Sequence, residues 1–263
     1  MSYREKKIGE RLSGELLRKE RQERYLVKRS EESEALEAVF DKKTLMTVYS
    51  MMNRGILKTL NGAIRAGKEA KVYHGVRHDG KEVAVKIYYT VTASFKRRLP
   101  YLVGDPRFAE VQKTGHALIY EWVKKEFRNL RQAKSAGVAV PEPYACQKNV
   151  LVMEFIGRDG IAAPTLNEAE SVDSKDYKSV LQEMVKLTRR AKLVHGDLSE
   201  FNVFKSDEGI LLFDFASAVD LFHPMAKEFL LRDIRNINRF FAKKGVEVVS
   251  EVKILKRCWA DEF

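Results

Sequence analysis

The 263-residue sequence is poor in the residues that mark fibrous, disulfide-rich or unfolded proteins. It contains two cysteines, six prolines and fifteen glycines. So little glycine and proline excludes collagen-like and low-complexity classes. The two cysteines, Cys146 and Cys258, have no pairing pattern, and this indicates a reducing compartment. No apolar run approaches the roughly 20 residues of a membrane-spanning helix, so we expect no membrane partner.

An export signal is also missing at the start of the sequence. Its first residues, MSYREKKIGERL, are charged from the fourth position and contain no apolar signal core. We therefore expect a cytoplasmic location. With 44% hydrophobic residues, the chain has enough apolar material for one or two cores.

Positive charge is what the chain has in excess. Lysine and arginine number 48 against 37 acidic residues, which gives a net charge of +11. Such a surplus favours an acidic partner, such as a nucleic acid, a nucleotide or an anionic surface. It does not distinguish between these partners.

The first segment, residues 1–47, differs from the rest in its density of charge. Residues 1–40 hold 10 basic and 9 acidic side chains, so the net charge of this stretch is only +1. Lys, Arg, Glu and Leu favour a helix here, but the apolar residues are too sparse to bury a full face. A solvated helical extension and a partly disordered tail both fit this composition.

Residues 48–157 are expected to form a strand-rich lobe. A short apolar segment leads to a turn at Gly67, and a hairpin follows, turning at Asp79-Gly80. In its second strand Lys86 projects from the face opposite to Val83 and Val85. Residues 90–118 are expected to form a long loop, in which Lys96-Arg97-Arg98 could contact RNA phosphate or simply be solvated.

The remainder of this lobe contains a helix and a strand. Val123, Phe127 and Leu130 recur at helical spacing, and Gly137 is expected to end the helix. Pro141 and Pro143 then form an extended break before an apolar strand, NVLVMEFIG.

Residues 158–263 are expected to form a helical lobe. After a connector that ends near Ser174, helical spacing runs from Val180 to Leu193. A loop, the strand ILLFDF and a last helix over residues 227–244 follow. Strands first and helices second predict an α+β fold with two lobes.

The segment His195-Gly-Asp-Leu-Ser-Glu-Phe-Asn202 carries the clearest chemical signal. Asp197 and Asn202, five residues apart, can place a carboxylate and an amide in one pocket. Asp214 ends an apolar strand, where a carboxylate is costly unless it is paired or binds a cation. Because Mg²⁺ prefers oxygen ligands, Asn202 and Asp214 fit a metal site and Asp197 remains free to accept a proton. This pattern is typical of phosphoryl transfer.

The other groups that such a reaction needs can also be found. A cation is required on the nucleotide phosphates, and Lys86 in the run VAVK lies on a predicted strand. The lysine needs an acidic partner on the following helix. Glu126 is the best candidate and Glu121 the reserve, although an exposed helix charge explains either residue as well.

Five motifs taken together resemble the RIO family of atypical serine/threonine protein kinases. In this sequence they read GKEAKVYHG, VAVKIY, KEFRNL, VLVMEFIG and HGDLSEFN. The resemblance covers about residues 50–245. The HGDLSE run and the lack of an N-terminal winged-helix domain favour the type-one subfamily, in an archaeal-like minimal form. The resemblance implies a two-lobed protein-kinase-like fold with a reduced helical lobe.

The resemblance also implies roles for individual residues. Lys86 would hold ATP phosphates, Asp197 would be the catalytic base, and Asn202 and Asp214 would ligate Mg²⁺, with Mn²⁺ as an alternative. Asp214 would also be the site of an aspartyl-phosphate, which implies ATPase activity. The remaining nucleotide contacts would come from an adenine-binding segment and a nucleotide loop, which comprise Met153, Glu154, Ile156, Gly67, Lys68, Glu69, Ala70 and Val72.

Departures from ordinary protein kinases point to the same family. No G-x-G-x-x-G loop is present, and the usual Asp-Phe-Gly is Asp214-Phe-Ala216. About 49 residues follow Asp214, too few for a standard peptide-docking lobe. Lys71 stands where the family more often has Asn, so an extra cation would lie in the nucleotide loop.

The family implies maturation of the small ribosomal subunit, with the precursor subunit, its ribosomal RNA and a protein substrate, including the chain itself, as partners. Two alternatives remain open. A small-molecule phosphotransferase of the aminoglycoside- or choline-kinase sort uses a similar loop, but its helical lobe is larger and acidic. A non-catalytic scaffold that senses ATP would bind nucleotide without turnover.

Several other residues have weaker claims to a function. His195 is better explained as a structural support of the catalytic loop than as a base. His223 and the two cysteines lack metal-ligand spacing. Ser94 and Thr114 are candidate autophosphorylation sites.

Overall fold

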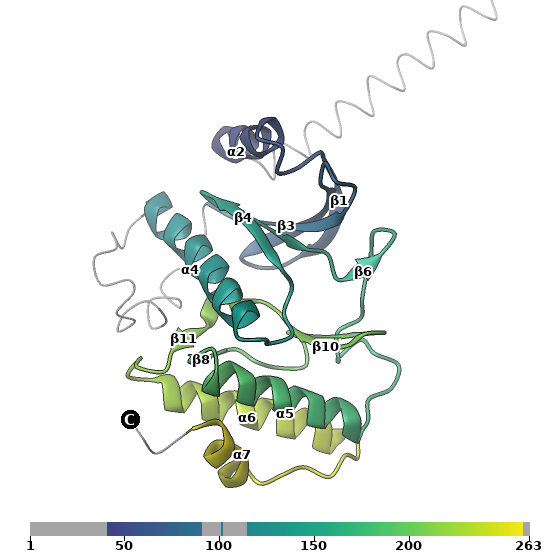
Figure 1. Ribbon diagram of the computed structural model, residues 1–263, viewed down its shortest axis with the longest axis vertical. Helices are drawn as coiled ribbons and strands as arrows, with labels where there is room; N and C mark the ends of the chain where they lie inside the picture. The colour runs from purple at the N-terminus through teal and green to yellow at the C-terminus, as the bar shows by residue number, and fades with distance from the viewer. Residues whose placement is uncertain (1–40, 91–100, 102–114, 260–263) are drawn as a thin grey trace, which may run out of the picture. The chain divides into compact units, whose positions relative to one another are not determined.

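The computed structural model describes residues 41–90, 101 and 115–259 (Figure 1). The chain divides into a unit of Met1–Met46 and a unit of Thr47–Phe263. In the first unit the described residues are 41–46, where helix α2 (Lys42–Asn53) begins. The predictions for residues 1–40, for Ser94, for Lys96-Arg97-Arg98 and for Thr114 lie outside the described residues. All that follows concerns the second unit.

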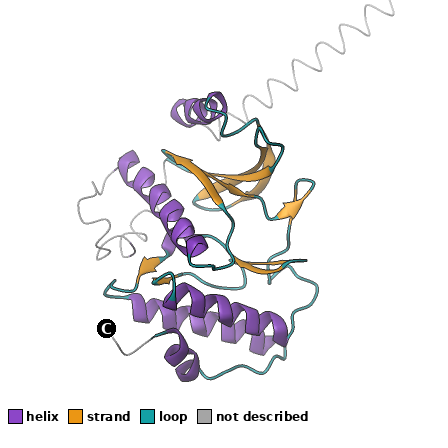
Figure 2. Cartoon of the chain, in the orientation of Figure 1, coloured by secondary structure: helices purple, strands orange, loops and turns teal. Residues whose placement is uncertain are grey.

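An antiparallel sheet of five strands forms the first lobe (Figures 1 and 2). Its spatial order is β1-β2-β3-β5-β4. The strands are β1 (Thr59–Ala66), β2 (Ala70–Val76), β3 (Glu82–Tyr88), β4 (Pro143–Gln147) and β5 (Val150–Glu154).

The predicted hairpin is confirmed, and it forms the centre of this sheet. β2 and β3 pair in continuous register from Ala70 opposite Tyr88 to Val76 opposite Glu82. The chain reverses at Gly80, whose φ of 83° suits glycine. β3 is buried along almost its whole length on both faces, so Lys86 and the valines both lie in protein interior.

Two edge strands differ from the predictions. The segment before Gly67 was expected to lead only into a turn, but its end forms β1, most of which is exposed. Pro141 and Pro143 were expected to form an extended break before the next strand, but Pro143 is itself the first residue of β4. Proline is tolerated there because an edge strand has an unpaired side. Neither edge carries the apolar alternation by which strands are recognised.

Helix α4 (Gly115–Ser135) follows the sheet's central strands in sequence. Its apolar spacing was predicted, as was its end before Gly137, whose φ is 75°. The helix begins at Gly115, inside the stretch that was predicted to be loop up to residue 118. α4 packs against β4 and against a short 3₁₀ helix, η3 (Phe215–Ser217), so it touches both lobes.

The second lobe is built on helices, with most of the short strands beside them, whereas the β6–β7 hairpin lies beside the sheet of the first lobe (Figures 1 and 2). The helices are α5 (Ser174–Arg189), α6 (Ala226–Lys243) and α7 (Glu251–Cys258). The short strands pair antiparallel as β6 with β7, β8 with β11 and β9 with β10. Their bounds are β6 Gly157–Arg158, β7 Ile161–Ala162, β8 Leu193–Val194, β9 Val203–Ser206, β10 Gly209–Leu212 and β11 Val219–Asp220.

The predicted helix over residues 180–193 is too long at its end. α5 stops at Arg189, and Leu193 lies in β8 opposite Asp220. Ala191 and Leu193 are buried like the helical residues before them. The apolar spacing therefore continues past the end of the helix, because these residues are buried without being helical. Lys192, with a φ of 54°, turns the chain into the strand. The last helix was predicted within one residue, whereas α7 and the β6–β7 connector hairpin were not expected.

The mixture of an antiparallel sheet with a helical lobe confirms the predicted α+β class. One continuous cluster of buried residues extends from Leu151 and Met153 of the sheet through α4 to α5 and α6. Among the described residues, no helix combines the length and the apolar content needed to cross a bilayer.

Gly157, at the join between β5 and β6, is packed closely against the other strand of the β6–β7 hairpin. A Cβ at this position would meet Ile161 O and would lie 2.8 Å from Ala162 Cα, both of them backbone atoms that cannot move aside. We expect Gly157→Ala to lower the free energy of unfolding by about 1–3 kcal/mol, because the hairpin must shift. Urea titration measures the loss. Gly62→Ala is the matched control, since Gly62 has no atom within 4 Å of the added Cβ; equal stability of the two variants would contradict the prediction.

Candidate functional site

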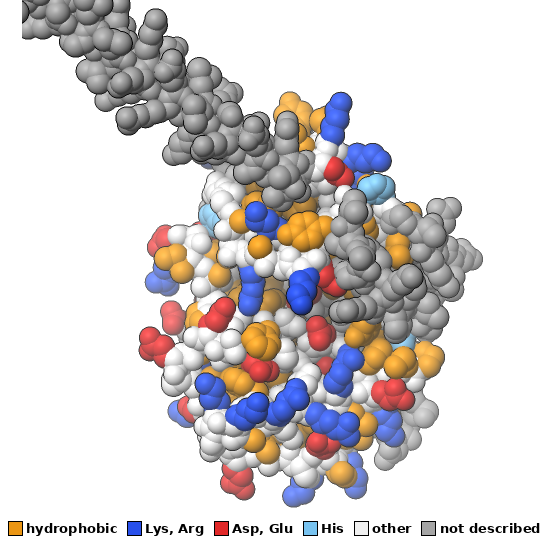
Figure 3. Space-filling view, turned by 180° about the vertical axis from the view of Figure 1, so that it is seen from behind, with side chains coloured by type: hydrophobic (Ala, Val, Ile, Leu, Met, Phe, Trp, Pro, Cys, Tyr) orange, Lys and Arg blue, Asp and Glu red, His pale blue; other side chains and the backbone are white. Residues whose placement is uncertain are grey.

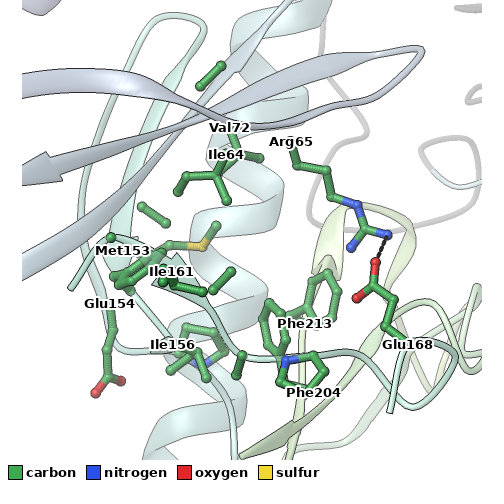
Figure 4. Close-up of a pocket in the computed structure, with 18 residues that line it drawn as sticks. Ile64, Arg65, Val72, Met153, Glu154, Ile156, Ile161, Glu168, Phe204 and Phe213 are labelled. Atoms are coloured by element: carbon green, nitrogen blue, oxygen red, sulfur yellow. Dashed lines mark ion pairs between the residues drawn. The ribbon is translucent and has the colours of Figure 1, made fainter. Parts of the chain in front are cut away.

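A cavity of about 650 Å³ lies where the sheet meets the helical lobe (Figure 4). The sheet lines it with Val72, Ala84, Met153 and Glu154, and Ile156 lines it from the chain that leaves the sheet. Phe204 and Phe213 form its floor, stacked with ring centroids 4.0 Å apart. The lining is mostly apolar, as expected of a pocket that takes a flat ring.

An ion pair crosses the side of the cavity opposite to Met153 and Glu154 (Figure 4). Arg65 of β1 lies 3.7 Å from Glu168 of the helical lobe, with both side chains about half exposed. Glu168 also accepts hydrogen bonds from the Thr165 N–H and hydroxyl, which hold the pKa of its carboxyl below the usual range. An exposed pair of this kind contributes little stability, so it can open without a large cost.

Beyond the cavity, Lys86 bridges two carboxylates from distant parts of the chain. Its Nζ lies 2.7 Å from Glu126 Oε1 on α4 and 2.8 Å from Asp214 Oδ1. Tyr88, two residues further along β3, donates its hydroxyl proton to the second oxygen of Glu126. The lysine therefore has Glu126 as its helical partner, whereas Glu121 pairs with Lys124.

Burial and charge oppose each other in this network. Desolvation would lower the pKa of Lys86, but the two carboxylates outweigh it and the pKa rises well above its usual value. Desolvation raises the pKa of Glu126 despite the adjacent ammonium. For Asp214 burial also favours the neutral form, yet Lys86 outweighs it and the pKa is lowered. The lysine therefore stays charged, and it keeps Asp214 ionised.

Side chains of α6 form hydrogen bonds with the backbone of the loop from His195 to Asn202. Buried Asp233 accepts the N–H of Gly196 at 2.8 Å and that of Leu198 at 2.9 Å. Arg232 donates to the Gly196 carbonyl, and Asn236 donates to Leu198 O at 3.1 Å. Four hydrogen bonds from these three residues thus hold the backbone on both sides of Asp197.

Asp197 lies between these anchored residues with its side chain open to solvent. Partial desolvation raises the pKa of its carboxyl to about 6, and the negative charge of Asp214 adds to the rise. A carboxyl group with a pKa close to the ambient pH is suited to accept a proton.

Asn202 and Asp214 are brought together by the β9–β10 hairpin. The Asn202 amide donates to the Asp197 carbonyl at 2.8 Å, and Phe213 N–H donates to the Asn202 carbonyl at 3.1 Å. Asp214 follows with a φ of 63°, a conformation that is uncommon outside glycine. Because the Asn202 amide nitrogen is engaged, its Oδ1 is the atom that can face a cation.

The segment after Asp214 is fixed by two polar side chains of α4. Lys125 donates to the carbonyls of Ala216, at 3.0 Å, and Ala218. Asn129 donates to Phe215 O at 3.0 Å and to Ala218 O at 2.8 Å. Both side chains are fully buried. One face of α4 therefore supplies Glu126 to Lys86 and also the donors that shape the backbone next to Asp214.

His195 supports the residue that precedes Asp214. Its Nε2 lies 2.9 Å from Phe213 O, so this nitrogen must carry the proton. Desolvation lowers the pKa of the ring to about 4 and keeps it neutral. This geometry suits the structural role that was predicted for it.

The residues predicted to bind nucleotide divide into two groups. Val72, Met153, Glu154 and Ile156 line the cavity, whereas the loop residues Gly67, Lys68, Glu69 and Ala70 do not. The loop turns tightly, with Gly67 N–H bonded to Ala70 O at 2.9 Å. Lys71 lies with Nζ 5.4 Å from the ring centroid of Tyr73. Since side chains alternate along β2, Lys71 faces away from the side on which Val72 lines the cavity.

Other parts of the site were not found from the sequence. Lys125 and Asn129 are four residues apart on α4, but exposed charges show the same spacing. Asp233 lies inside an apolar helix stripe and would have been the strongest signal, because a carboxylate there must be satisfied. Among the described residues, no three His, Cys, Asp or Glu side chains cluster as a metal site. A Mg²⁺ ion held by one carboxylate, one amide and phosphate oxygens needs no such cluster.

The fold and the site together define the class of the protein. A β-strand lysine paired with a helix glutamate, an anchored aspartate loop and an aspartate after a hairpin are the parts of a protein-kinase-like site. The chain matches the family model described as the RIO domain over residues 71–254. It belongs to the RIO family of serine/threonine-protein kinases.

Curated relatives support this assignment. The chain is 38% identical to RIO-type serine/threonine-protein kinase Rio1 of Haloferax volcanii, covering 85% of this chain and 77% of that protein. It is 40% identical to Rio1 of Methanocaldococcus jannaschii, covering 89% and 78%. Human serine/threonine-protein kinase RIO1 is 38% identical, and the match covers 86% of this chain but only 41% of the human protein. The predicted archaeal, type-one resemblance is thus confirmed.

Solved structures agree with the fold. The Rio2 kinase from Chaetomium thermophilum in its ADP/Mg²⁺-phosphoaspartate complex superposes with a TM-score of 0.62 at 21% identity, covering 82% of this chain and 66% of that one. A second structure of that kinase gives a TM-score of 0.63 at 22% identity, covering 82% and 68%. At this identity the likeness concerns the fold alone.

The buried Lys86–Glu126 pair can be tested through stability. Lys86→Met removes the cation and leaves Glu126 buried without it, so we expect the free energy of unfolding at neutral pH to fall by about 3 kcal/mol. Adding Glu126→Gln removes the unpaired charge, and the double variant should recover part of the loss. Urea titration of the three proteins measures both effects. A double variant less stable than Lys86→Met alone would contradict the prediction.

Proposed function

We propose that this chain transfers the γ-phosphoryl group of ATP, with Mg²⁺, to serine or threonine hydroxyls of proteins, including its own. The observation that carries the proposal is the convergence of Lys86, Asp214 and Asn202 beside the anchored loop of Asp197. Phosphoryl transfer requires groups in these positions more than it requires covalent chemistry by the protein.

Each of these residues has a distinct task in the proposal. Lys86, held by Glu126, would bind ATP phosphates with a charge that burial does not remove. Asp197, in its ionised form, would accept the proton of the attacking hydroxyl. The contacts of Asp233 with Gly196 and Leu198 keep that carboxylate in place.

The donor set fits a hard cation. Asp214 supplies a carboxylate kept ionised by Lys86, and Asn202 supplies an amide oxygen. These two oxygen ligands are the number that Mg²⁺ takes from protein when phosphates and water complete its shell. Mn²⁺ is the alternative. When bound, the ion would neutralise charge on the phosphates, and Asn202 and Asp214 would hold it.

The adenine ring would occupy the cavity between Val72 and the stacked phenylalanine pair. At its edge, the Glu154 N–H is bonded to Glu142 O at 2.8 Å, and Ile156 O accepts Ala163 N–H at 2.9 Å. We assign the other two groups, the Glu154 carbonyl and the Ile156 N–H, to adenine. Met153 would form the wall of the pocket. Gly67, Lys68, Glu69 and Ala70 would cover the phosphates.

A second acceptor is built into the same site. The solved Rio2 kinase is described as a phosphoaspartate complex. We propose that Asp214 of this chain accepts phosphate in the same way, which would make the protein an ATPase as well as a kinase. Release of phosphate from Asp214 to water would then complete each cycle.

Incubation with γ-labelled ATP and Mg²⁺ tests both activities. We expect Asp197→Ala and Asp214→Ala each to reduce transfer by about 10²-fold or more, because one removes the base and the other a metal ligand. Label resistant to hydroxylamine indicates a hydroxyl acceptor, and hydroxylamine-sensitive label indicates Asp214.

Asp207→Ala, in the exposed turn between β9 and β10, is the matched control and should keep wild-type transfer. Equal labelling and phosphate release by the wild type and both site variants would remove the catalytic proposal. Nucleotide binding without turnover would instead support an ATP-sensing scaffold.

We further propose that the chain is cytoplasmic and acts in maturation of the small ribosomal subunit. The family resemblance suggests the role, and the net charge of +11 suits a ribosomal RNA partner. In this proposal residues 1–47 form an extension, 48–157 the nucleotide lobe with its hinge, and 158–263 the reduced helical lobe.

Binding of small-subunit precursor RNA tests the ribosomal proposal. If lysines and arginines neutralise phosphates, affinity must fall steeply with salt, by about 10-fold or more between 50 and 200 mM. Filter binding across a salt series measures the slope. Affinity that is equal to that of an acidic protein of similar size, or that does not change with salt, would contradict it.

A further inference from the structure

The exposed face of α6 carries a line of basic side chains that begins at its contacts with the loop of Asp197 and continues beyond them. With 3.6 residues per turn, positions 232, 236, 239 and 243 fall within an arc of roughly 60°. They are Arg232, Asn236, Arg239 and Lys243, and the three cations are exposed. The opposite face of the helix is buried in the core. We call these four residues the α6 stripe.

The stripe begins at the catalytic loop. Arg232 donates to the carbonyl of Gly196, next to Asp197, and its charge acts against the rise in the pKa of Asp197. Asn236 donates to Leu198 O on the other side of the same aspartate. From there the stripe runs about 17 Å along the helix to Lys243. One end therefore lies where an acceptor hydroxyl must be placed.

The two outer cations of the stripe, Arg239 and Lys243, differ from Arg232, whose charge acts on the carboxylates of Asp197 and Asp233. Among the described residues, Arg239 and Lys243 form no ion pair with a carboxylate, and Arg239 bonds the neutral Asn236 at 2.8 Å. Arg235, on the flank of the stripe, does pair with Glu251 of α7 at 3.0 Å. Glu228 lies one turn before Arg232, so the basic surface starts at the catalytic loop and extends only away from it.

The space-filling view agrees with this placement. α6 lies behind α5 in Figure 1, so the reversed view of Figure 3 faces it. Lysine and arginine side chains gather in a row across the lower half of that face. An incoming chain would therefore meet several positive charges along this face and not a single one.

We propose that the α6 stripe is the docking surface for the protein substrate, and that it selects an acidic segment next to the acceptor serine or threonine. This inference rests on the proposed kinase activity. An extended peptide covers about 17 Å in roughly five residues. The acidic residues should therefore occupy about the first five positions on one side of the acceptor.

The dimensions favour a peptide over RNA as the occupant. The stripe is one helix wide and presents three cations, whereas specific nucleic-acid surfaces bury roughly 1,000 Å² or more of protein. Its continuity with Asp197 also suits a chain that must bring a hydroxyl to that carboxylate.

Binding of fluorescent peptides tests the proposal without any turnover. Three peptides of about twelve residues with a central serine are compared: glutamates before it, glutamates after it, and glutamines on both sides. Anisotropy with the full chain should show one acidic peptide binding about tenfold or more tighter than the glutamine peptide. The double variant with Arg239→Glu and Lys243→Glu should remove that difference, because two side chains that attract the acidic peptide would then repel it.

Lys178→Glu with Lys253→Glu is the control, since it makes the same change in net charge at exposed positions on α5 and α7. It should retain the preference for the acidic peptide, and thermal unfolding verifies that both double variants fold. In phosphorylation assays the stripe variant should raise KM for the acidic peptide about tenfold with kcat changed less than about twofold.

Three results would overturn the docking surface. The acidic and glutamine peptides could bind equally to the wild type, or both double variants could lose the preference alike. Alternatively, the stripe variant could lose affinity for a single-stranded RNA of about twelve nucleotides but not for the acidic peptide, which would make the stripe a nucleic-acid surface. Because peptide binding needs no turnover, an inactive protein that still shows the preference would refute the kinase proposal and not the docking surface.

Discussion

The buried ammonium group of Lys86 is the constraint on which the rest of the site depends. A cation removed from water must be surrounded by acceptors, and here they come from α4 and from the chain after β10. Satisfying this one charge ties the sheet to α4 and both to the helical lobe. The same contact keeps Asp214 ionised, so the structural requirement and the chemical one are met by the same atoms.

The loop from His195 to Asn202 obeys a related rule. Its backbone leaves polar groups in the interior, and a buried N–H or carbonyl without a partner is costly. Asp233, Arg232 and Asn236 satisfy these groups from one face of α6. Burial raises the pKa of Asp233 to about 7, although the two N–H donors oppose this rise. The carboxyl group is thus buried at a cost while it holds the backbone on both sides of Asp197.

The sequence predicted those features that leave a periodic or short-range signal. The β2–β3 hairpin followed from Asp79-Gly80 between two alternating runs, and the pairing of Lys86 with Glu126 followed from a strand lysine and a nearby helix. β1 and β4 could not be predicted, because edge strands do not need the alternation by which strands are recognised. The hydrogen bonds of Lys125 and Asn129 to the backbone after Asp214 could not be predicted either, because their acceptors lie about 90 residues further along the chain.

The hydrogen bonds of Lys125 and Asn129 also restrict the movement of α4 relative to Asp214. If α4 moved outward, four carbonyl contacts from Phe215, Ala216 and Ala218 would lose their donors at the same moment as Lys86 lost Glu126. Each orphaned buried group costs about 1–3 kcal/mol, so such an excursion would unravel the strand end that carries Asp214. Through the contacts of the described residues, the position of α4 and that of Asp214 are therefore fixed together.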